Sequence, residues 1–150
     1  MSIEDIEKEI SRLCSISRLS EQEAASIDPE KVRRFLTSTI VTDALNSQEY
    51  YREYRFTVNI PASMADEDVP DEIKDYPVIL QGSVDLAIEN KDDIIVVDYK
   101  TDKVNDVNEL SRRYRKQLML YKEALHQTFS KPVSKCLIYS IYLGEVLEVS

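Results

Sequence analysis

The chain has 150 residues, of which 43% are hydrophobic and 31% are charged, and its formal net charge is −9. This composition indicates one globular domain and excludes a disordered chain. No apolar run is long enough for a membrane helix or a signal peptide, so we expect a cytoplasmic protein without a membrane partner. The negative charge argues against unaided capture of a polyanion, and the two cysteines, Cys14 and Cys136, are predicted to be free thiols.

The first third of the chain is predicted to be helical. Apolar residues recur every three or four positions over residues 3–14, as on the buried face of a helix. Ser20 and Glu23 have the spacing of a capping box and start a second short helix. Asp28 and Pro29 supply an N-cap and a first-turn proline for a third helix.

The middle of the chain is predicted to form strands around an acidic loop. Apolar and polar side chains alternate over residues 50–60, which indicates a strand with one buried face. Residues 64–77 form a long acidic loop. Between residues 66 and 93 there are ten acids and two lysines, a net charge of −8, so the remaining residues sum to −1. The acidic excess is therefore local.

Two strand-like runs, residues 80–88 and 94–100, flank a polar turn at residues 90–93 and predict a β-hairpin. If the turn is centred between Lys91 and Asp92, residue 90 faces residue 93, and the same count places Asp85 opposite Asp98. Directly opposed residues share a sheet face, and Lys100 lies on that face because it is two residues beyond Asp98. We also expect Asp85 to point away from an apolar face formed by Val84 and Leu86.

Residues 109–127 are predicted to form the longest helix. Its apolar stripe consists of Leu110, Tyr114, Leu118, Tyr121 and Leu125. Gln117 lies on the flank of this stripe, four residues before Tyr121, so the two are neighbours on the helix surface. The helix also carries a basic cluster, residues 112–116, which in most proteins is a solvated helix face.

Two short strands, residues 133–142 and 146–149, close the chain around a turn at Gly144. The element order is then helices, three strands, one helix and two strands. This order predicts an α/β fold with a mixed central sheet flanked by helices and a helical N-terminal segment.

The hairpin residues suggest a metal site. Two facing carboxylates, Asp85 and Asp98, repel each other unless a cation lies between them or one of them is protonated. Mg²⁺ suits this position because it prefers oxygen ligands and is typically held by one or two carboxylates, and the backbone carbonyl of Tyr99 could add a ligand. Lys100 would orient a water or stabilise charge that develops on a phosphate. Together these residues predict hydrolysis of a phosphodiester.

A simpler interpretation remains open at this point. An acid and a lysine two residues apart are common by chance, and the hairpin could be a solvated acidic turn with Lys100 in a surface ion pair. A Gly-x-x-Asp strand followed by a turn and an apolar strand ending in Asp-x-Lys is more specific than either run alone.

Three runs, residues 82–85, 98–101 and 117–121, resemble the RecB-type branch of the PD-(D/E)XK nuclease superfamily. The resemblance covers the chain from about residue 27 to its end and implies a fold of restriction-endonuclease type. It implies that Asp85 and Asp98 bind metal and that Lys100 is catalytic. The helix residues Gln117, Tyr121 and Tyr114 would lie beside the DNA path.

The resemblance further implies the nuclease domain of an ATP-dependent helicase/exonuclease that processes double-strand DNA ends in recombinational repair. Its cofactor would be Mg²⁺, with Mn²⁺ as a substitute, and ATP would be used only by motor parts outside this chain. The expected partners are single DNA strands from unwound ends, helicase motor domains of the same parent chain and a second helicase–nuclease subunit. Residues 1–150 would form one nuclease domain, with a lead-in at 1–46 and a catalytic core at 47–150.

Members of this branch usually carry a further metal-ligand histidine on an upstream helix. The only histidine here, His126, follows every motif and is not a plausible substitute. We therefore expect a fragment that starts downstream of that helix, with Glu53 as the best remaining acid, although Glu53 could equally be a rim residue of an edge strand. The alternative function is a catalytically silent nuclease-like module that guides DNA or docks a subunit.

Overall fold

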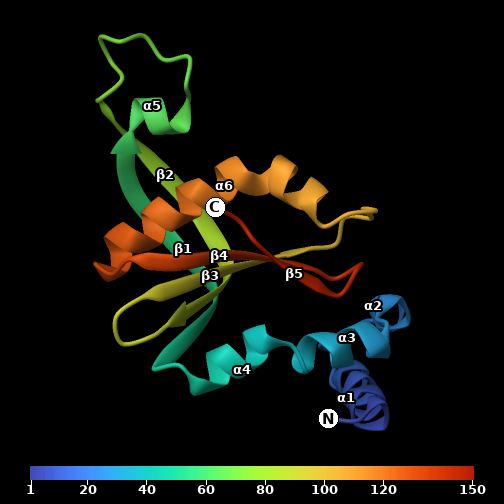
Figure 1. Cartoon of the computed structure of the whole chain (residues 1–150). Helices are drawn as coiled ribbons and strands as arrows, with labels where there is room; N and C mark the ends of the chain where they lie inside the picture. Colours follow the sequence, from blue (N-terminus) through green and yellow to red (C-terminus); the bar gives the residue numbers. More distant parts are fainter. The chain divides into compact units, whose positions relative to one another are not determined.

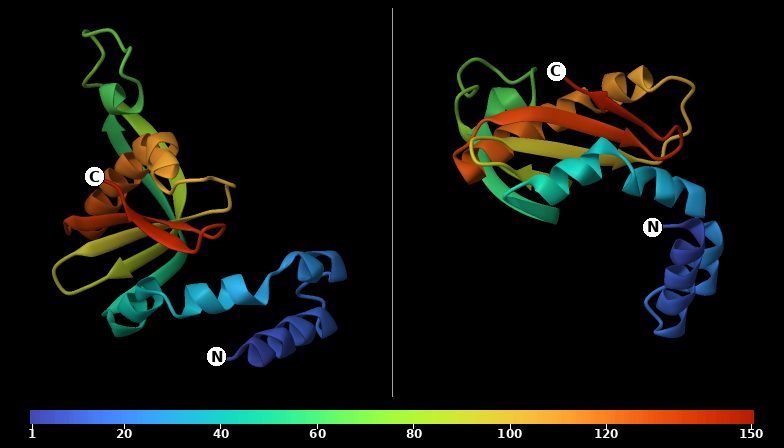
Figure 2. Two further views of the ribbon diagram at one scale, coloured as in Figure 1. Left: turned by 45° about the vertical axis from the view of Figure 1, so that its right-hand side comes forward. Right: turned by 60° about the horizontal axis from the view of Figure 1, so that its bottom comes forward.

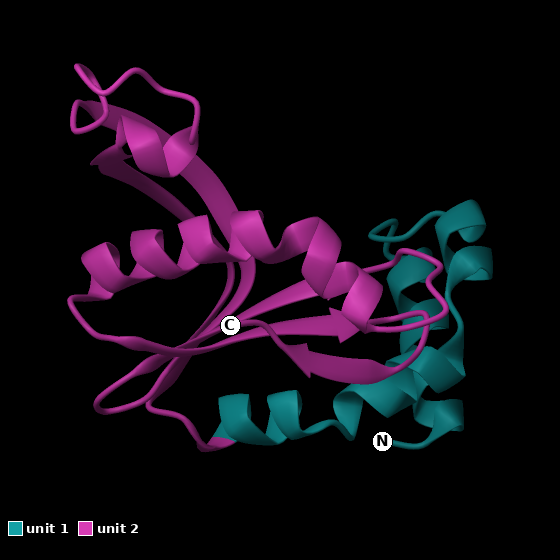
Figure 3. Ribbon diagram, turned by 45° about the horizontal axis from the view of Figure 1, so that its top comes forward, with its two compact units in different colours: residues 1–45 teal, residues 46–150 magenta.

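The computed structural model describes residues 1–150 and separates into two compact units, Met1–Leu45 and Asn46–Ser150 (Figure 1, Figure 3). The first unit is helical, and the second contains a sheet with helices. The two cysteines, Cys14 and Cys136, are free, as predicted.

Side-chain caps start helices of the first unit where the sequence predicts them. The helices are α1 (Ile3–Ser15), α2 (Glu21–Ser26), α3 (Pro29–Leu36) and α4 (Thr39–Asn46). The amide of Glu23 donates to the Ser20 hydroxyl and the amide of Ser20 donates to the Glu23 carboxylate, which closes the capping box of α2. Asp28 caps α3. The sequence does not predict α4, because its first four residues are all β-branched and therefore favour strands.

The second unit is built on one mixed sheet whose strands keep their order along the chain. The strands are β1 (Glu49–Pro61), β2 (Pro77–Glu89), β3 (Ile94–Lys100), β4 (Val133–Ser140) and β5 (Glu145–Glu148). All neighbouring strands are antiparallel except β3 and β4, which run parallel. A parallel pair needs a crossover, which α6 (Asn108–Phe129) provides, and α5 (Ala62–Ala65) follows the end of β1 (Figure 2). The predicted fold class is confirmed.

Strand boundaries follow the predicted ones closely, except at the start of β2 and the end of β4. This strand begins at Pro77, three residues before the predicted start, because it pairs with the long β1 as far as Pro61. β3 has the predicted bounds. β4 ends at Ser140 rather than at residue 142, since the turn into β5 already begins there.

One face of α6 packs on the sheet, as its apolar stripe predicts (Figure 2). Leu110, Leu118 and Leu125 are fully buried in a cluster that includes Val96 and Ile138. Each buried leucine contributes roughly 1.5–3 kcal/mol to folding, so this face fixes α6 on the sheet. None of the helices is both long and apolar enough to cross a membrane.

Strict alternation holds along β1 from Tyr54 onward but not through the middle of β2. On β1, Phe56 and Ile60 are buried and Asn59 is exposed. On β2, residues 86–88 are all buried, so the single apolar face expected over residues 80–88 is wrong for this part of the strand. A continuous buried run is typical of a strand covered on both faces.

Glu89 ties three segments together at the end of β2. Its carboxylate accepts hydrogen bonds from Lys131 at 2.6 Å and from the Tyr51 hydroxyl at 2.8 Å. These hydrogen bonds, that from Lys131 most strongly, hold the pKa of Glu89 below its ordinary value. The stabilisation is therefore present above the pKa of an unfolded glutamate and is lost as the pH falls through the lower pKa of the folded state.

Glu89→Gln should lower the free energy of unfolding at pH 7 by about 1–3 kcal/mol, because hydrogen bonds to a charged group contribute that much. The difference from the parent chain should shrink as the pH falls below about 4, where an unfolded glutamate is protonated. Urea unfolding at several pH values measures both effects. Glu145→Gln, at an exposed strand end, is the matched control and should show neither. A loss that persists unchanged at pH ~3 would contradict this account.

Candidate active site

The β2–β3 hairpin brings two aspartates together in the register that the sequence predicts. The ladder runs from the turn as far as Leu86 and Val97, so Asp85 and Asp98 are the next residues in the same register. Asp85 and Asp98 are not themselves a paired position of the β2–β3 ladder. Instead, Oδ2 of Asp85 accepts a hydrogen bond from the amide of Tyr99 at 2.7 Å. The Asp85 side chain is thereby fixed against β3.

Asp98 is the buried acid of this site, with only 4% of its surface exposed. Burial raises its pKa, the nearby Lys100 ammonium opposes this, and the charge of Asp85 raises the pKa further. Oδ2 of Asp98 is ion-paired with Nζ of Lys100 at 2.6 Å and accepts no other hydrogen bond. A buried carboxylate beside a second carboxylate is unfavourable unless a proton or a cation compensates it.

Lys100 is held by groups from both β3 and α6. Its ammonium group pairs with Asp98, donates to Oε1 of Gln117 at 3.3 Å and lies 4.0 Å from the ring centre of Tyr114. The Tyr114 hydroxyl in turn donates to the two carboxylate oxygens of Asp102 at 2.9 and 3.1 Å. Because each contact limits the rotamers of a long side chain, Lys100 has little freedom to leave Asp98.

Tyr121 lies within electrostatic reach of the same groups. Burial raises the pKa of its hydroxyl, and the charge of Asp98 raises it further. Its ring packs edge-on against Phe56, with ring centres 5.6 Å apart. Phe56 covers Gly82 so closely that an added Cβ there would lie 2.6 Å from the ring. The absence of a side chain at Gly82, the first residue of the Gly-x-x-Asp run, therefore allows the Phe56 ring, and with it Tyr121, to lie close to β2.

Glu53 lies next to Asp85 across the β1–β2 pair in an unusual backbone conformation. The ladder includes its neighbours Arg52 and Tyr54 but skips Glu53, whose φ is 51°. Such a left-handed residue costs about 1–3 kcal/mol, and strain of this kind clusters at functional sites. Arg52 and Glu53 line a cavity of about 850 Å³ together with Asp85 and Tyr99.

No third acid, histidine or cysteine completes a metal-holding cluster with Asp85 and Asp98. Glu53 lines the cavity beside Asp85 without joining such a cluster. His126 lies within hydrogen-bond distance of the Lys131 carbonyl instead, with Nδ1 2.8 Å from that oxygen.

The residues present nevertheless fit a hard divalent cation. Asp98 offers a buried carboxylate whose Oδ2 is paired with the Lys100 ammonium group, and the charge of the Asp85 carboxylate acts on it. Two carboxylates suffice for Mg²⁺, which keeps several waters and completes its coordination with substrate phosphate oxygens.

Sequence reasoning missed two residues of this region. Asp102 anchors Tyr114, and its place two residues after Lys100 on the same polar run could have indicated it. Arg52 lies near Tyr99: burial and then the charge of Asp85 raise the pKa of the tyrosine to about 12, and the guanidinium opposes this rise. Neither contact can be read from spacing alone, because each joins residues from different elements.

Comparison with known proteins identifies the family of this chain. Residues 4–145 match the family model of the PD-(D/E)XK nuclease superfamily. Three relatives are named as ATP-dependent helicase/nuclease subunits. The protein of Acetivibrio thermocellus is 36% identical over 96% of this chain, that of Clostridium botulinum strain Hall is 32% identical over 97%, and that of Clostridium acetobutylicum is 30% identical over 99%.

The chain spans 12% of the length of each of these relatives. The match nevertheless includes both acid-bearing strands, the Asp-x-Lys run and the helix that holds the lysine. The chain belongs to the PD-(D/E)XK nuclease superfamily.

Proposed function

We propose that this chain is the nuclease domain of an ATP-dependent helicase–nuclease and that it hydrolyses phosphodiester bonds in single DNA strands with Mg²⁺, or with Mn²⁺ in its place. The observation that carries the proposal is the buried Asp98 carboxylate, which lies beside the charge of Asp85 and has one oxygen 2.6 Å from Nζ of Lys100. The names of the relatives support a nuclease within a larger helicase protein.

Asp85, Asp98 and the backbone carbonyl of Tyr99 are the groups that would hold the cation. When bound, the cation polarises the scissile phosphate and lowers the pKa of a bound water. Lys100 donates hydrogen bonds to the phosphate oxygens on which charge develops, or to the attacking water. Its ammonium group is already placed for this, because Asp98 and Gln117 restrict its position.

The three α6 residues have different roles in this proposal. Gln117 uses Oε1 to accept from Lys100, which leaves its amide group to donate to a DNA phosphate. Tyr121 borders the acid pair and closes the site on the side of Phe56. Tyr114 covers Lys100 with its ring and is anchored through its hydroxyl, so its contacts support a positioning role for the lysine.

The rest of the parent protein enters only as part of this proposal. Residues 1–46 would be a helical lead-in and residues 47–150 the catalytic core. Motor domains elsewhere in the parent would use ATP to open a double-strand end and deliver one strand, and a second helicase–nuclease subunit would handle the other. The local acidic excess of the chain agrees with a strand that is delivered rather than captured from solution.

A second candidate function is a catalytically silent module that guides DNA or docks a subunit. Two observations favour it: no third ligand joins Asp85 and Asp98, and Lys100 already neutralises Asp98. The intact acid pair with its lysine favours the nuclease.

Cleavage of an end-labelled single-stranded oligonucleotide tests the choice. We expect cleavage with Mg²⁺ or Mn²⁺ and none after chelation, both in this chain and in the longer protein of which we propose it is a part. Binding of the strand without cleavage in either protein would favour the silent module and contradict the nuclease.

A further inference from the structure

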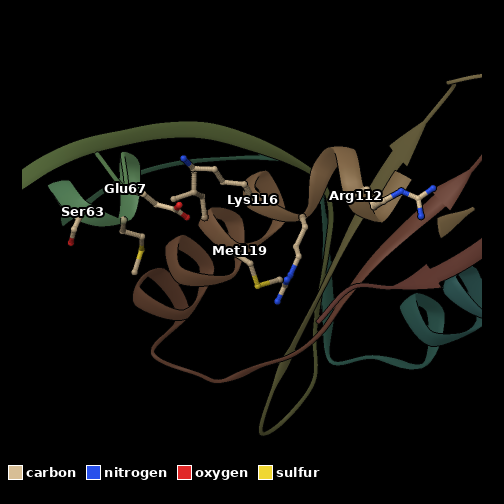
Figure 4. Close-up of a pocket in the computed structure, with 8 residues that line it drawn as sticks. Ser63, Glu67, Arg112, Lys116 and Met119 are labelled. Carbon is tan, nitrogen blue, oxygen red and sulfur yellow. The ribbon is translucent and has the colours of Figure 1, made fainter. Parts of the chain in front are cut away.

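A second concave surface lies on α6, away from the Lys100 site. A helix turns by about 100° per residue, so Arg112, Lys116 and Met119 face away from Tyr114 and Gln117. They line a cavity of about 580 Å³ with Met64 of α5 and with Glu67 just beyond it. Figure 4 shows Lys116 and Met119 on α6 facing the segment that carries Glu67, with Arg112 one turn nearer the start of the helix.

A neighbouring cavity of about 400 Å³ continues this surface along α6. It shares Met64 and Met119 with the first cavity and adds Lys122, Glu123 and His126. We call the two together the α6 groove. From Arg112 to Lys122 it follows ten residue steps of helix, a length of about 15 Å.

The cations of the α6 groove lack acidic partners. No side-chain hydrogen bond or ion pair joins Arg112, Arg115, Lys116 or Lys122 to any other residue. On the same helix, in contrast, Arg113 pairs with both Asp102 and Glu109. A chain with a net charge of −9 has many acids available, so uncompensated cations in one groove call for an anionic ligand.

The floor of the α6 groove is apolar and adaptable. Met64 is 39% exposed, and Met119 beside it is half-buried. Unbranched thioether side chains adjust to ligands of irregular shape, and bare cations bind phosphates without reading bases. This combination suits a ligand that presents regularly spaced negative charges together with flat apolar groups, as a nucleic-acid strand does.

We infer that the α6 groove binds the phosphodiester backbone of a single nucleic-acid strand, independently of sequence. The inference rests on the proposed nuclease function, because DNA is the polyanion that this function supplies. The groove contains no acid pair comparable to Asp85 and Asp98, so its role is to retain the strand. Glu67 is the acid that lines the first cavity, and it weakens this binding by repulsion.

Binding of a fluorescein-labelled single-stranded oligonucleotide, followed by anisotropy over a series of salt concentrations, tests the inference. Each protein in the series carries Asp98→Asn, so that cleavage cannot interfere. Arg115→Ala with Lys116→Ala should weaken binding and reduce the slope of log K against log salt by about 1.4, since each contact to a single strand contributes about 0.7. Glu67→Gln should strengthen binding.

Lys91→Ala with Lys135→Ala removes two exposed cations outside the groove and is the matched control. Equal losses in the control, an unchanged salt slope in the groove variant, or no binding even at low salt would each overturn the inference. Binding is measured here without cleavage, so the two proposals can fail separately. If the unmutated chain binds DNA through the α6 groove but does not cleave it, the nuclease proposal is contradicted and this inference stands.

Discussion

Asp98→Asn should abolish cleavage of single-stranded DNA while the chain stays folded. The substitution removes a charged oxygen from the proposed metal site and leaves Lys100 without its ion-pair partner. Loss of one preorganised charged group at a reacting centre typically reduces kcat by at least about 10²-fold. Burial already raises the pKa of Asp98, so a neutral side chain of the same size should not lower the thermal midpoint of the metal-free chain.

Rates from an oligonucleotide assay and thermal midpoints from circular dichroism measure the two effects separately. Asp92→Asn, in the exposed turn of the same hairpin, is the matched control and should change neither. Cleavage by Asp98→Asn within a few-fold of the parent rate would contradict the assigned role, even if the fold were intact.

Tyr114→Leu should lower kcat with little change in KM, whereas Tyr114→Phe should keep most of the activity. The leucine removes the ring that lies 4.0 Å from Nζ of Lys100, and the phenylalanine removes only the hydroxyl that donates to Asp102. A desolvated cation–π contact contributes roughly 1–2 kcal/mol, which corresponds to about a 10-fold loss of kcat in the leucine variant.

Steady-state kinetics distinguish this positioning role from the DNA contact that the sequence suggests for Tyr114. A ring that stacks on bases contributes to binding, so its loss would raise KM and spare kcat. That outcome, or equal losses in the leucine and phenylalanine variants, would show that Tyr114 does not act through Lys100.

The sequence predicts those parts of the fold that local chemistry determines. The caps at Ser20 and Asp28 and the bounds of β3 are confirmed because each depends on a few neighbouring residues. The missed helix α4 shows the limit, since its β-branched start favours a strand and only the surrounding structure overrides that preference. The buried run at residues 86–88 likewise depends on what covers the sheet.

The sequence predicts those parts of the candidate site that depend only on the register of the β2–β3 hairpin. Counting across one turn places Asp85 opposite Asp98, and the observed register agrees. The left-handed backbone of Glu53 interrupts a run that reads as an ordinary strand, so no pattern indicates it. The contact between Gln117 and Lys100 also joins two elements whose relative placement the sequence does not specify.

The proposed nuclease function requires that Asp85 and Asp98 hold a divalent cation beside Lys100. Isothermal titration calorimetry of this chain with Mg²⁺ and with Mn²⁺ tests it most directly, because it does not depend on DNA or on turnover. We expect saturable binding by the parent chain and by Asp92→Asn, and no binding by Asp98→Asn. Absence of binding in the parent chain, or equal binding in all three, would contradict the claim.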